Sequence, residues 1–336
     1  MHRYLVGLLG GAAGTLALLA GGYYAALGLA PDRVPAPAIT RLEHLDEKLA
    51  FLRARPDLDP TVLAIGSSMT WRQFDGSAFV AMAGGEAHVL NGGTAFLKTH
   101  QTRFVADFYL DHFPNVRTVI QITNLPDFRR CHSEPAEMFD REDAAAYAFG
   151  RDPALPFYLR YFAPYRYLRT ARDLPQQRRL GGGELALDHF GSGPIGSQRD
   201  RGLFYGPIAV ERDCIAPLVE LARRMAARGI HYVVVFAPVH PAYFAAYPAM
   251  RTETEAVVSL LRTHLRPYEA EVIAMQTEPG YRPADFYDAF HLHWPAVRRL
   301  SRQIADRLQA RGTPNGAAPN LTSRAANASP IPAVVQ

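Results

Sequence analysis

Short apolar runs alternate with amphipathic stretches along most of the chain. The apolar runs are rich in branched side chains and show no polar alternation, which is typical of strands covered on both faces. They occupy residues 61–65, 88–90, 118–122, 232–236 and 271–274. The amphipathic stretches have helical spacing and lie near 98–112, 211–228, 251–266 and 295–311. This alternation predicts an α/β domain with a central parallel sheet and helices on both sides.

The first 31 residues differ from the rest. No charged side chain occurs from Tyr4 to Pro31, and a helix of about 20 such residues can cross the hydrocarbon core of a membrane. The single Arg3 before the run is a weak positive-inside signal. A cleaved signal peptide is the alternative, but the run is long for one and Ala26-Leu-Gly28 is a poor cleavage site. We expect an N-terminal anchor over 1–31, a single pass, and an exported remainder.

The rest of the chain divides by composition. Residues 32–40 are rich in proline and predict an extended linker that lifts the domain off the bilayer. An α/β domain is expected over 41–311, and it begins with an amphipathic helix in which Leu42, Leu45, Leu49 and Leu52 recur. Residues 128–208 predict a long insertion, either a cap over the site or an irregular surface excursion. The tail over 312–336 has too few apolar residues to order itself.

Composition narrows the classes of partner. The 336 residues are 48% hydrophobic and 20% charged, enough to bury a sizeable core. The formal charge of +4 comes with no lysine-rich run or nucleic-acid motif, so we expect no nucleic-acid partner. The two cysteines, Cys131 and Cys214, could pair in an oxidising compartment or remain as two buried thiols.

Four short segments place polar groups where strands end or where the last helix begins. They are Gly66-Ser-Ser-Met-Thr70, Asn91-Gly-Gly-Thr94, Thr123-Asn124 and Asp288-Ala-Phe-His291. Open parallel sheets bind ligands outside the carboxyl ends of their strands. The first three segments are therefore expected at one edge, to which the loop carrying the fourth can return.

These residues, in this order, resemble the SGNH (GDSL-like) esterase and acyltransferase superfamily over about residues 60–310, apart from the insertion. The resemblance implies a flavodoxin-like three-layer α/β/α sandwich with a Ser-His-Asp triad. By position, Ser68 matches the nucleophile, and Asp288 and His291 match the acid and base. The family's sequence motifs are called blocks; the second contains a glycine and the third an asparagine. Gly92 or Gly93 matches the second-block glycine, and Asn124 matches the third-block asparagine.

The chain departs from the family pattern in two blocks. The family's Gly-Asp-Ser is here Gly-Ser67-Ser68, and its Gly-x-Asn-Asp becomes Ile122-Thr-Asn-Leu125. A Gly-Ser-Ser block after a membrane anchor resembles the envelope branch of the superfamily. That branch acts in D-alanylation of teichoic acid and O-acetylation of exported polysaccharides. The resemblance thus implies a bacterial-type inner or plasma membrane, an envelope glycan as substrate and a membrane protein as possible acyl donor.

The same residues make chemical sense together. A serine attacks only when a base removes its proton, so His291 has to lie within hydrogen-bond reach of Ser68. Asp288 would fix the imidazole tautomer and stabilise the imidazolium. The N–H of Ser68, a glycine N–H and the Asn124 amide would form an oxyanion hole. Ser67 is the rival nucleophile. The sequence predicts a serine esterase or O-acyltransferase, with acetyl as the expected group.

Each segment also has a structural interpretation. Ser67 and Ser68 could cap a helix, Asn91 and Gly92 could form a turn, and His291 could belong to an aromatic cluster with Trp294. The alternative function is a catalytically inactive relative that binds glycan or serves as a scaffold in polysaccharide assembly. His240, His291 and His293 lack carboxylates or cysteines at ligand spacing, so we expect no metal and no cofactor.

Overall fold

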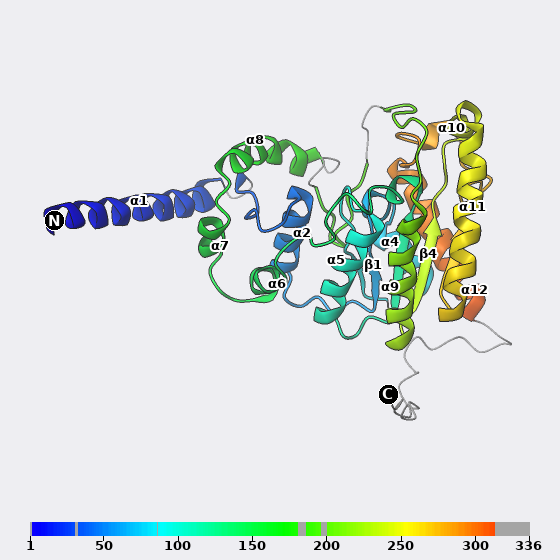
Figure 1. Ribbon diagram of the computed structural model, residues 1–336, viewed down its shortest axis with the longest axis horizontal. Helices are drawn as coiled ribbons and strands as arrows, with labels where there is room; N and C mark the ends of the chain where they lie inside the picture. Colours follow the sequence, from blue (N-terminus) through cyan, green and yellow to red (C-terminus); the bar gives the residue numbers. More distant parts are fainter. Residues whose placement is uncertain (1, 31–32, 86, 181–185, 196–199, 313–336) are drawn as a thin grey trace, which may run out of the picture.

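A five-stranded parallel sheet forms the centre of the molecule (Figure 1). The computed structural model describes residues 2–30, 33–85, 87–180, 186–195 and 200–312. The strands are β1 (Val62–Ala64), β2 (Val89–Asn91), β3 (Thr118–Thr123), β4 (His231–Phe236) and β5 (Glu271–Ala274). Their order is β2-β1-β3-β4-β5. All five predicted strands are confirmed, and Leu63, Ile120 and Val234 are fully buried, as expected for a sheet covered on both faces.

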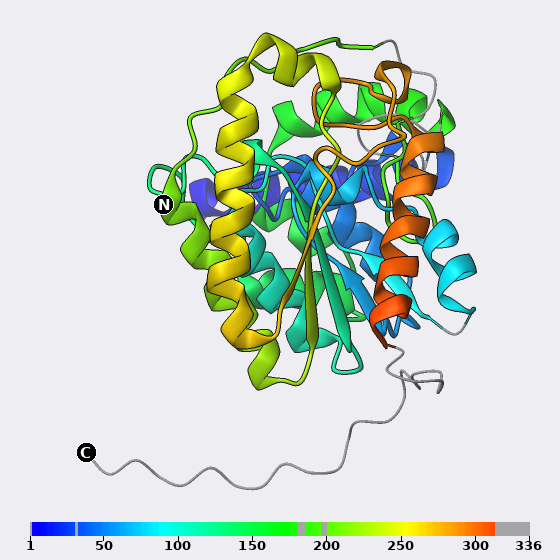
Figure 2. The ribbon, with the colours of Figure 1, turned by 90° about the vertical axis from the view of Figure 1, so that its right-hand side faces the viewer.

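Helices cover the two faces of the sheet. One layer holds α5 (Thr99–His112), α9 (Ala216–Ala227) and α11 (Pro248–Leu265), and α9 packs against both of the others. The opposite layer holds α4 (Gly76–Ala83) and α12 (Trp294–Gly312), which pack together. Figure 2 shows the sheet between α11 and α12. The predicted three-layer α/β/α arrangement is therefore present.

Shorter elements complete the domain. They are α3 (Ser68–Trp71), α10 (Pro241–Ala246) and the 3-10 turns η2 (Leu125–Asp127), η3 (Arg212–Ile215), η4 (Arg266–Tyr268) and η5 (Pro283–Asp285). The strand order reverses between β1 and β3, which are neighbours with Val62 opposite Thr118. In doubly wound sheets the ligand crevice lies outside the carboxyl ends of the strands at such a reversal. Ser68 follows β1 and Asn124 follows β3, so both lie at this point.

The N-terminal helix α1 (His2–Leu29) projects from the domain (Figure 1). It is long and apolar enough to cross a membrane, and none of its most apolar window is buried. Residues 33–40, predicted as part of an extended linker that lifts the domain off the bilayer, make hydrogen bonds to the domain. Ala36 donates its N–H to Glu47 Oε1 at 3.0 Å, and Ala38 donates to the Tyr167 hydroxyl at 3.1 Å. Residues 35–37 are buried because they pack on the domain rather than entering solvent.

The described part of the segment 128–208 contains three helices between its irregular stretches. It contains α6 (Arg141–Phe149), α7 (Leu155–Arg160) and α8 (Pro164–Leu180), which lie near α2 (Glu43–Arg53) and the end of α1 (Figure 1). Arg169 of α8 pairs with Glu43 of α2 at 2.8 Å, and Arg166 pairs with Asp46. The three helices therefore extend the domain beside the anchor. Parts of the predicted insertion, at 181–185 and 196–199, and the predicted disordered tail beyond 312 lie outside the described residues.

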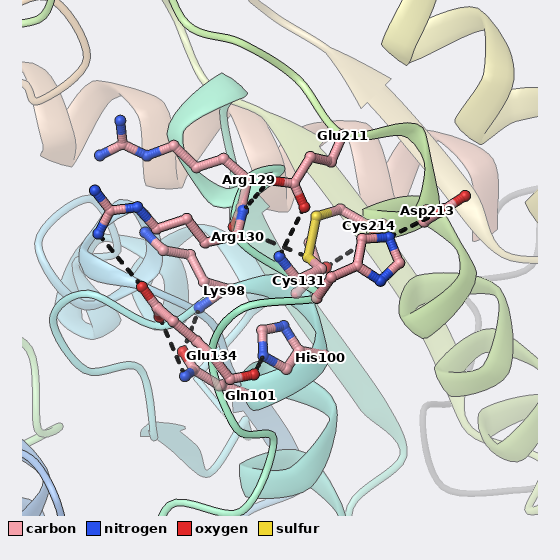
Figure 3. Close-up of a disulfide and its surroundings, with 12 residues drawn as sticks. Lys98, His100, Gln101, Arg129, Arg130, Cys131, Glu134, Glu211, Asp213 and Cys214 are labelled. Carbon is pink, nitrogen blue, oxygen red and sulfur yellow. Dashed lines mark hydrogen bonds and ion pairs between the residues drawn. A yellow bond between two sulfur atoms is a disulfide. The ribbon is translucent and has the colours of Figure 1, made fainter.

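A disulfide joins Cys131 to Cys214 (Figure 3). Of the two alternatives that the sequence left open, the structure has the paired one. The bond ties the loop after β3 to η3, and Thr99 at the start of α5 donates its hydroxyl to the Cys214 carbonyl at 2.7 Å. This cross-link fixes the loop after β3 close to the carboxyl edge of the sheet.

Candidate active site

The turn after β1 presents Ser68 at the start of α3. Gly66 has φ 151°, a conformation that L side chains rarely adopt, and a Cβ there would collide with the hydroxyl of Thr70. Ser67 is the N-cap and accepts the N–H of Met69 at 3.1 Å. Ser68 is thus the first helical residue, a position whose N–H has no partner within its own helix.

The short helix is fastened to the neighbouring strand. The Thr70 hydroxyl donates to the Ile122 carbonyl at 2.8 Å and accepts the Ile122 N–H at 3.0 Å. Thr70 is fully buried, so these bonds are shielded from water. A side chain fixed in this way gives the half-buried Ser68 a defined position relative to β3.

The loop before α12 brings an imidazole and a carboxylate to this serine. His291 Nε2 lies 3.0 Å from Ser68 Oγ, and His291 Nδ1 lies 2.8 Å from Asp288 Oδ2. Both Asp288 and His291 are buried. An isolated bridge between Phe286 and Leu292 closes the loop around them. The three predicted catalytic side chains therefore meet in series, with Ser68 rather than Ser67 facing the imidazole.

Asp288 is held as a carboxylate. Burial alone would raise its pKa, but the charge of His291 and its hydrogen bond, with the backbone N–H groups of Phe290 and His291, lower the pKa below its ordinary value. Both N–H groups donate to Oδ1 at 2.8 Å. A carboxylate beside Nδ1 places the ring proton there, which leaves Nε2 free to accept from the Ser68 hydroxyl.

The predicted oxyanion donors are only partly available. Gly92 donates its N–H to the Ala64 carbonyl at 2.7 Å, and Gly93 donates to Asn91 Oδ1 at 2.9 Å. Both glycine N–H groups are therefore used inside the protein, contrary to the role that the resemblance implied for them. A Cβ on Gly93 would lie 2.7 Å from the backbone nitrogen of Trp71, so this glycine allows the loop to approach α3 closely.

Asn124 is fully buried at the end of β3. Its Oδ1 accepts the N–H of Leu125 at 3.0 Å, and its Nδ2 donates to the Ala237 carbonyl at 3.2 Å. The second of these bonds joins the ends of β3 and β4. A side-chain amide has two N–H groups, so one remains for a ligand. Among the described residues the structure shows no acceptor for the N–H of Ser68 or for this second hydrogen, so these two predicted donors stay open.

Asp127, in η2, was not singled out from the sequence. It is buried, accepts the Thr123 hydroxyl at 2.8 Å, and is also hydrogen-bonded by Ser67. Burial raises its pKa to about 6, against lowering by those bonds and by the charges of Lys98 and His291. A carboxylate thus lies behind the nucleophile turn. The only sequence signal was its place three residues after Asn124.

Two other histidines have structural contacts. His240 caps α10, where its Nδ1 accepts the Ala242 N–H at 3.0 Å, and its ring lies against Phe286. His293 pairs with Asp200 at 2.7 Å. Within the described residues, no cluster of histidine, cysteine and carboxylate side chains is arranged to hold a metal.

Comparisons with known proteins gave structural similarities only. No protein-family profile matches the chain, and no curated protein matches it. A proposed arylesterase from Agrobacterium tumefaciens strain C58 is 14% identical, with a TM-score of 0.41, over 75% of this chain and 99% of that one. The inhibitor-bound aryl esterase of M. smegmatis is 11% identical, with a TM-score of 0.35, over 74% and 98%.

Proposed function

We propose that this protein is an extracytoplasmic serine esterase or O-acyltransferase that forms an acyl-enzyme at Ser68. The carrying observation is the continuous hydrogen-bonded series from Ser68 Oγ through His291 to Asp288, with separations of 3.0 and 2.8 Å. A hydroxyl, a base and a base-orienting carboxylate within such distances are the geometry required for nucleophilic acyl transfer.

The reaction follows from the positions of the protons. Ser68 Oγ bonds to the carbonyl carbon of the ester while its proton passes to His291 Nε2. As the ester C–O bond breaks, Nε2 returns that proton to the leaving alcohol. An acceptor hydroxyl then attacks the acyl-enzyme, gives its proton to Nε2, and Ser68 leaves with that proton. Water as acceptor gives hydrolysis, and a sugar hydroxyl gives transfer.

The developing oxyanion needs donors beside Ser68. The Ser68 N–H lies at the N-terminus of α3, where helix N–H groups have no internal acceptor, and Asn124 has a second amide hydrogen to offer. Removing one such donor typically slows acyl transfer about 10²–10³-fold. Two donors are therefore a sufficient basis for the proposal without Gly92 or Gly93.

The proposed substrate is a cell-envelope polysaccharide that carries or receives an acyl group, acetyl in the first instance. Its support is the resemblance of the Gly66-Ser-Ser segment to the envelope branch, together with α1 as a candidate membrane span. A membrane protein would supply the acyl group in the transferase case. The disulfide fits an oxidising compartment outside the cytoplasm.

A fluorophosphonate probe tests the proposal. Full-length wild-type protein in detergent should be labelled and should hydrolyse p-nitrophenyl acetate, whereas Ser68→Ala should do neither. Ser259→Ala is the matched control, since it removes a hydroxyl from an exposed position on α11 and should keep the label. Labelling of Ser68→Ala at the wild-type rate would place the nucleophile elsewhere and refute the assignment.

A non-catalytic glycan-binding or scaffold protein is the second candidate. The engagement of both glycine N–H groups inside the protein favours it, because a poor oxyanion hole is what an inactive relative would have. Absence of probe labelling and of ester hydrolysis in folded wild-type protein would support this candidate over the esterase.

A further inference from the structure

Three cationic side chains gather beside the candidate active site. Lys98 lies between the β2 loop and α5, and Arg129 and Arg130 follow η2. Figure 3 shows their side chains extending to the same side, next to the disulfide. Arg129 and Arg130 lie near enough to Lys98 to disfavour its charge. Like charges repel at such range, so their grouping needs a reason.

Only part of this charge is balanced within the protein. Arg130 pairs with Glu134 at 3.5 Å. Among the described residues, neither Lys98 nor Arg129 forms an ion pair. Lys98 is nevertheless only 9% exposed, and the Nε of Arg129 is buried without a hydrogen-bond acceptor. Burying a cation without a partner costs free energy. The charges of Asp127 and Glu134 offset part of this cost for Lys98, whereas the buried Nε of Arg129 has no acceptor among the described residues.

The loop that carries the arginines is held rigidly. Glu211 accepts the N–H of Arg130 at 2.7 Å and that of Cys131 at 3.0 Å. The disulfide fixes Cys131 to η3. The arginines therefore leave from a backbone that is already ordered, so binding a ligand has to order only their side chains.

The cluster adjoins the triad through Asp127 and Tyr205. Lys98 and His291 both lie near enough to Asp127 to favour its charged form. Burial and the charges of Asp288 and Asp127 raise the pKa of the Tyr205 hydroxyl, whereas the charge of Arg129 lowers it, so all three charged groups lie near that hydroxyl. The backbone gives the same placement, since Lys98 follows the second-block loop and Arg129 follows the turn after Asn124. The cluster thus occupies the same carboxyl edge of the sheet as Ser68.

We infer that Lys98 and Arg129 form a subsite for an anionic group, carboxylate or phosphate, on the molecule whose ester meets Ser68. Arginine can grip such a group with two parallel hydrogen bonds, and the lysine amine adds a point charge. The subsite rests on the proposed function, and it narrows the substrate class to acylated anionic glycans or phosphate-containing polymers.

Binding separates this subsite from catalysis. Full-length Ser68→Ala protein in detergent is titrated with acetylated oligogalacturonate, with its methyl-esterified counterpart, and with oligomeric glycerol phosphate. The carboxylate or the phosphate oligomer should bind at least about ten-fold more tightly than the methyl ester, since a hydrogen bond to a charged group is worth about that much. Which of the two binds identifies the anion.

Charge variants then test the residues. Lys98→Met and Arg129→Met, each in the Ser68→Ala background, should lose about ten-fold in affinity for the preferred anion and keep their affinity for the methyl ester. Arg262→Met removes the same charge from an exposed position on α11 and should bind like the parent. The anion should also raise the melting temperature of the parent but not that of Lys98→Met. Such a rise reports binding by folded protein.

Two outcomes overturn the inference. One is equal binding of the anionic and methyl-esterified oligomers; the other is binding by Lys98→Met and Arg129→Met that matches Arg262→Met. Neither depends on turnover. If the wild-type protein hydrolyses p-nitrophenyl acetate but fails these binding tests, the subsite is refuted and the esterase stands. If anions bind through Lys98 and Arg129 without any ester hydrolysis, the proposed function alone fails.

Discussion

Ser67 and Ser68 are neighbouring hydroxyls with different surroundings. Ser67 is buried, caps α3 and hydrogen-bonds to Asp127, whereas Ser68 is half-buried and meets His291. The structural and functional interpretations of this pair both apply, one to each serine. The cap fixes the first turn of the helix, and that turn sets the direction of the Ser68 hydroxyl.

Asp288→Asn should reduce acyl transfer while leaving the fold intact. An amide at this position can donate to Nδ1, which favours the ring tautomer with its proton on Nε2, where it blocks acceptance from Ser68. We expect kcat for p-nitrophenyl acetate to fall roughly 10³–10⁴-fold. Stopped assays at matched protein concentration measure it, with the urea unfolding midpoint as the folding control. An activity within three-fold or so of wild type would contradict the role of Asp288.

Asp127 should make stability depend on pH. Its pKa rises from an ordinary 3.8 to about 6 because it is buried. A raised pKa means that the folded state holds the proton more tightly, so stability from this group is present at low pH and is lost as pH rises through about 6. The loss amounts to about 3 kcal/mol.

Asp127→Asn removes that titration. The difference in unfolding free energy between variant and wild type should therefore shift in favour of the variant between pH 4 and pH 7, by up to about 3 kcal/mol. Urea unfolding at the two pH values measures it. A difference that stays constant with pH would show that Asp127 keeps its ordinary pKa in the folded protein.

At the scale of elements, the disulfide joins two segments that are 83 residues apart in sequence. Closing so long a loop restricts the unfolded chain, and the chain-entropy estimate is roughly 4 kcal/mol. Replacing both Cys131 and Cys214 by alanine should lower the unfolding free energy by about that amount, as measured in urea. A variant as stable as wild type would show that the pairing is not formed in solution.

The sheet could be predicted because its strands are continuous branched apolar runs, and the predicted and observed strand ends agree within one residue. Helices α6, α7 and α8 were not predicted. The helix α8 is largely polar and arginine-rich, with Arg166 and Arg169 paired to α2. Its stability comes from contacts with a distant segment, which no local periodicity reveals.

The candidate site, like the fold, was predicted only in part from the sequence. Ser68 lies after a predicted strand and Asp288 and His291 lie before the last predicted helix, and the resemblance to the SGNH pattern assigned their roles. Asp127 and Lys98 were not predicted, because an isolated Asp or Lys in a loop is an ordinary surface residue by sequence. Only burial makes either unusual, and burial depends on loops from several parts of the chain. The engagement of the Gly92 and Gly93 N–H groups likewise depends on their tertiary partners.

At the scale of the whole molecule, α1 should hold the protein in a membrane. We expect the full chain to remain with the membrane fraction after alkaline carbonate washing and to require detergent for extraction. In spheroplasts, protease added from outside should digest the domain if it is exported. Release by carbonate would show that α1 does not span the bilayer or has been cleaved.

The docking of residues 33–40 has a consequence for where such an enzyme could work. A flexible tether would let a catalytic domain sweep a wide volume around its point of attachment. Here Ala36 and Ala38 are hydrogen-bonded to α2 and α8, and Tyr23 of α1 lies against Tyr158 of α7 at 5.0 Å between ring centroids. With α1 in the bilayer, the domain would be held at a short and fixed distance from the membrane surface. A polymer strand would therefore have to pass close to where it leaves the membrane to be modified.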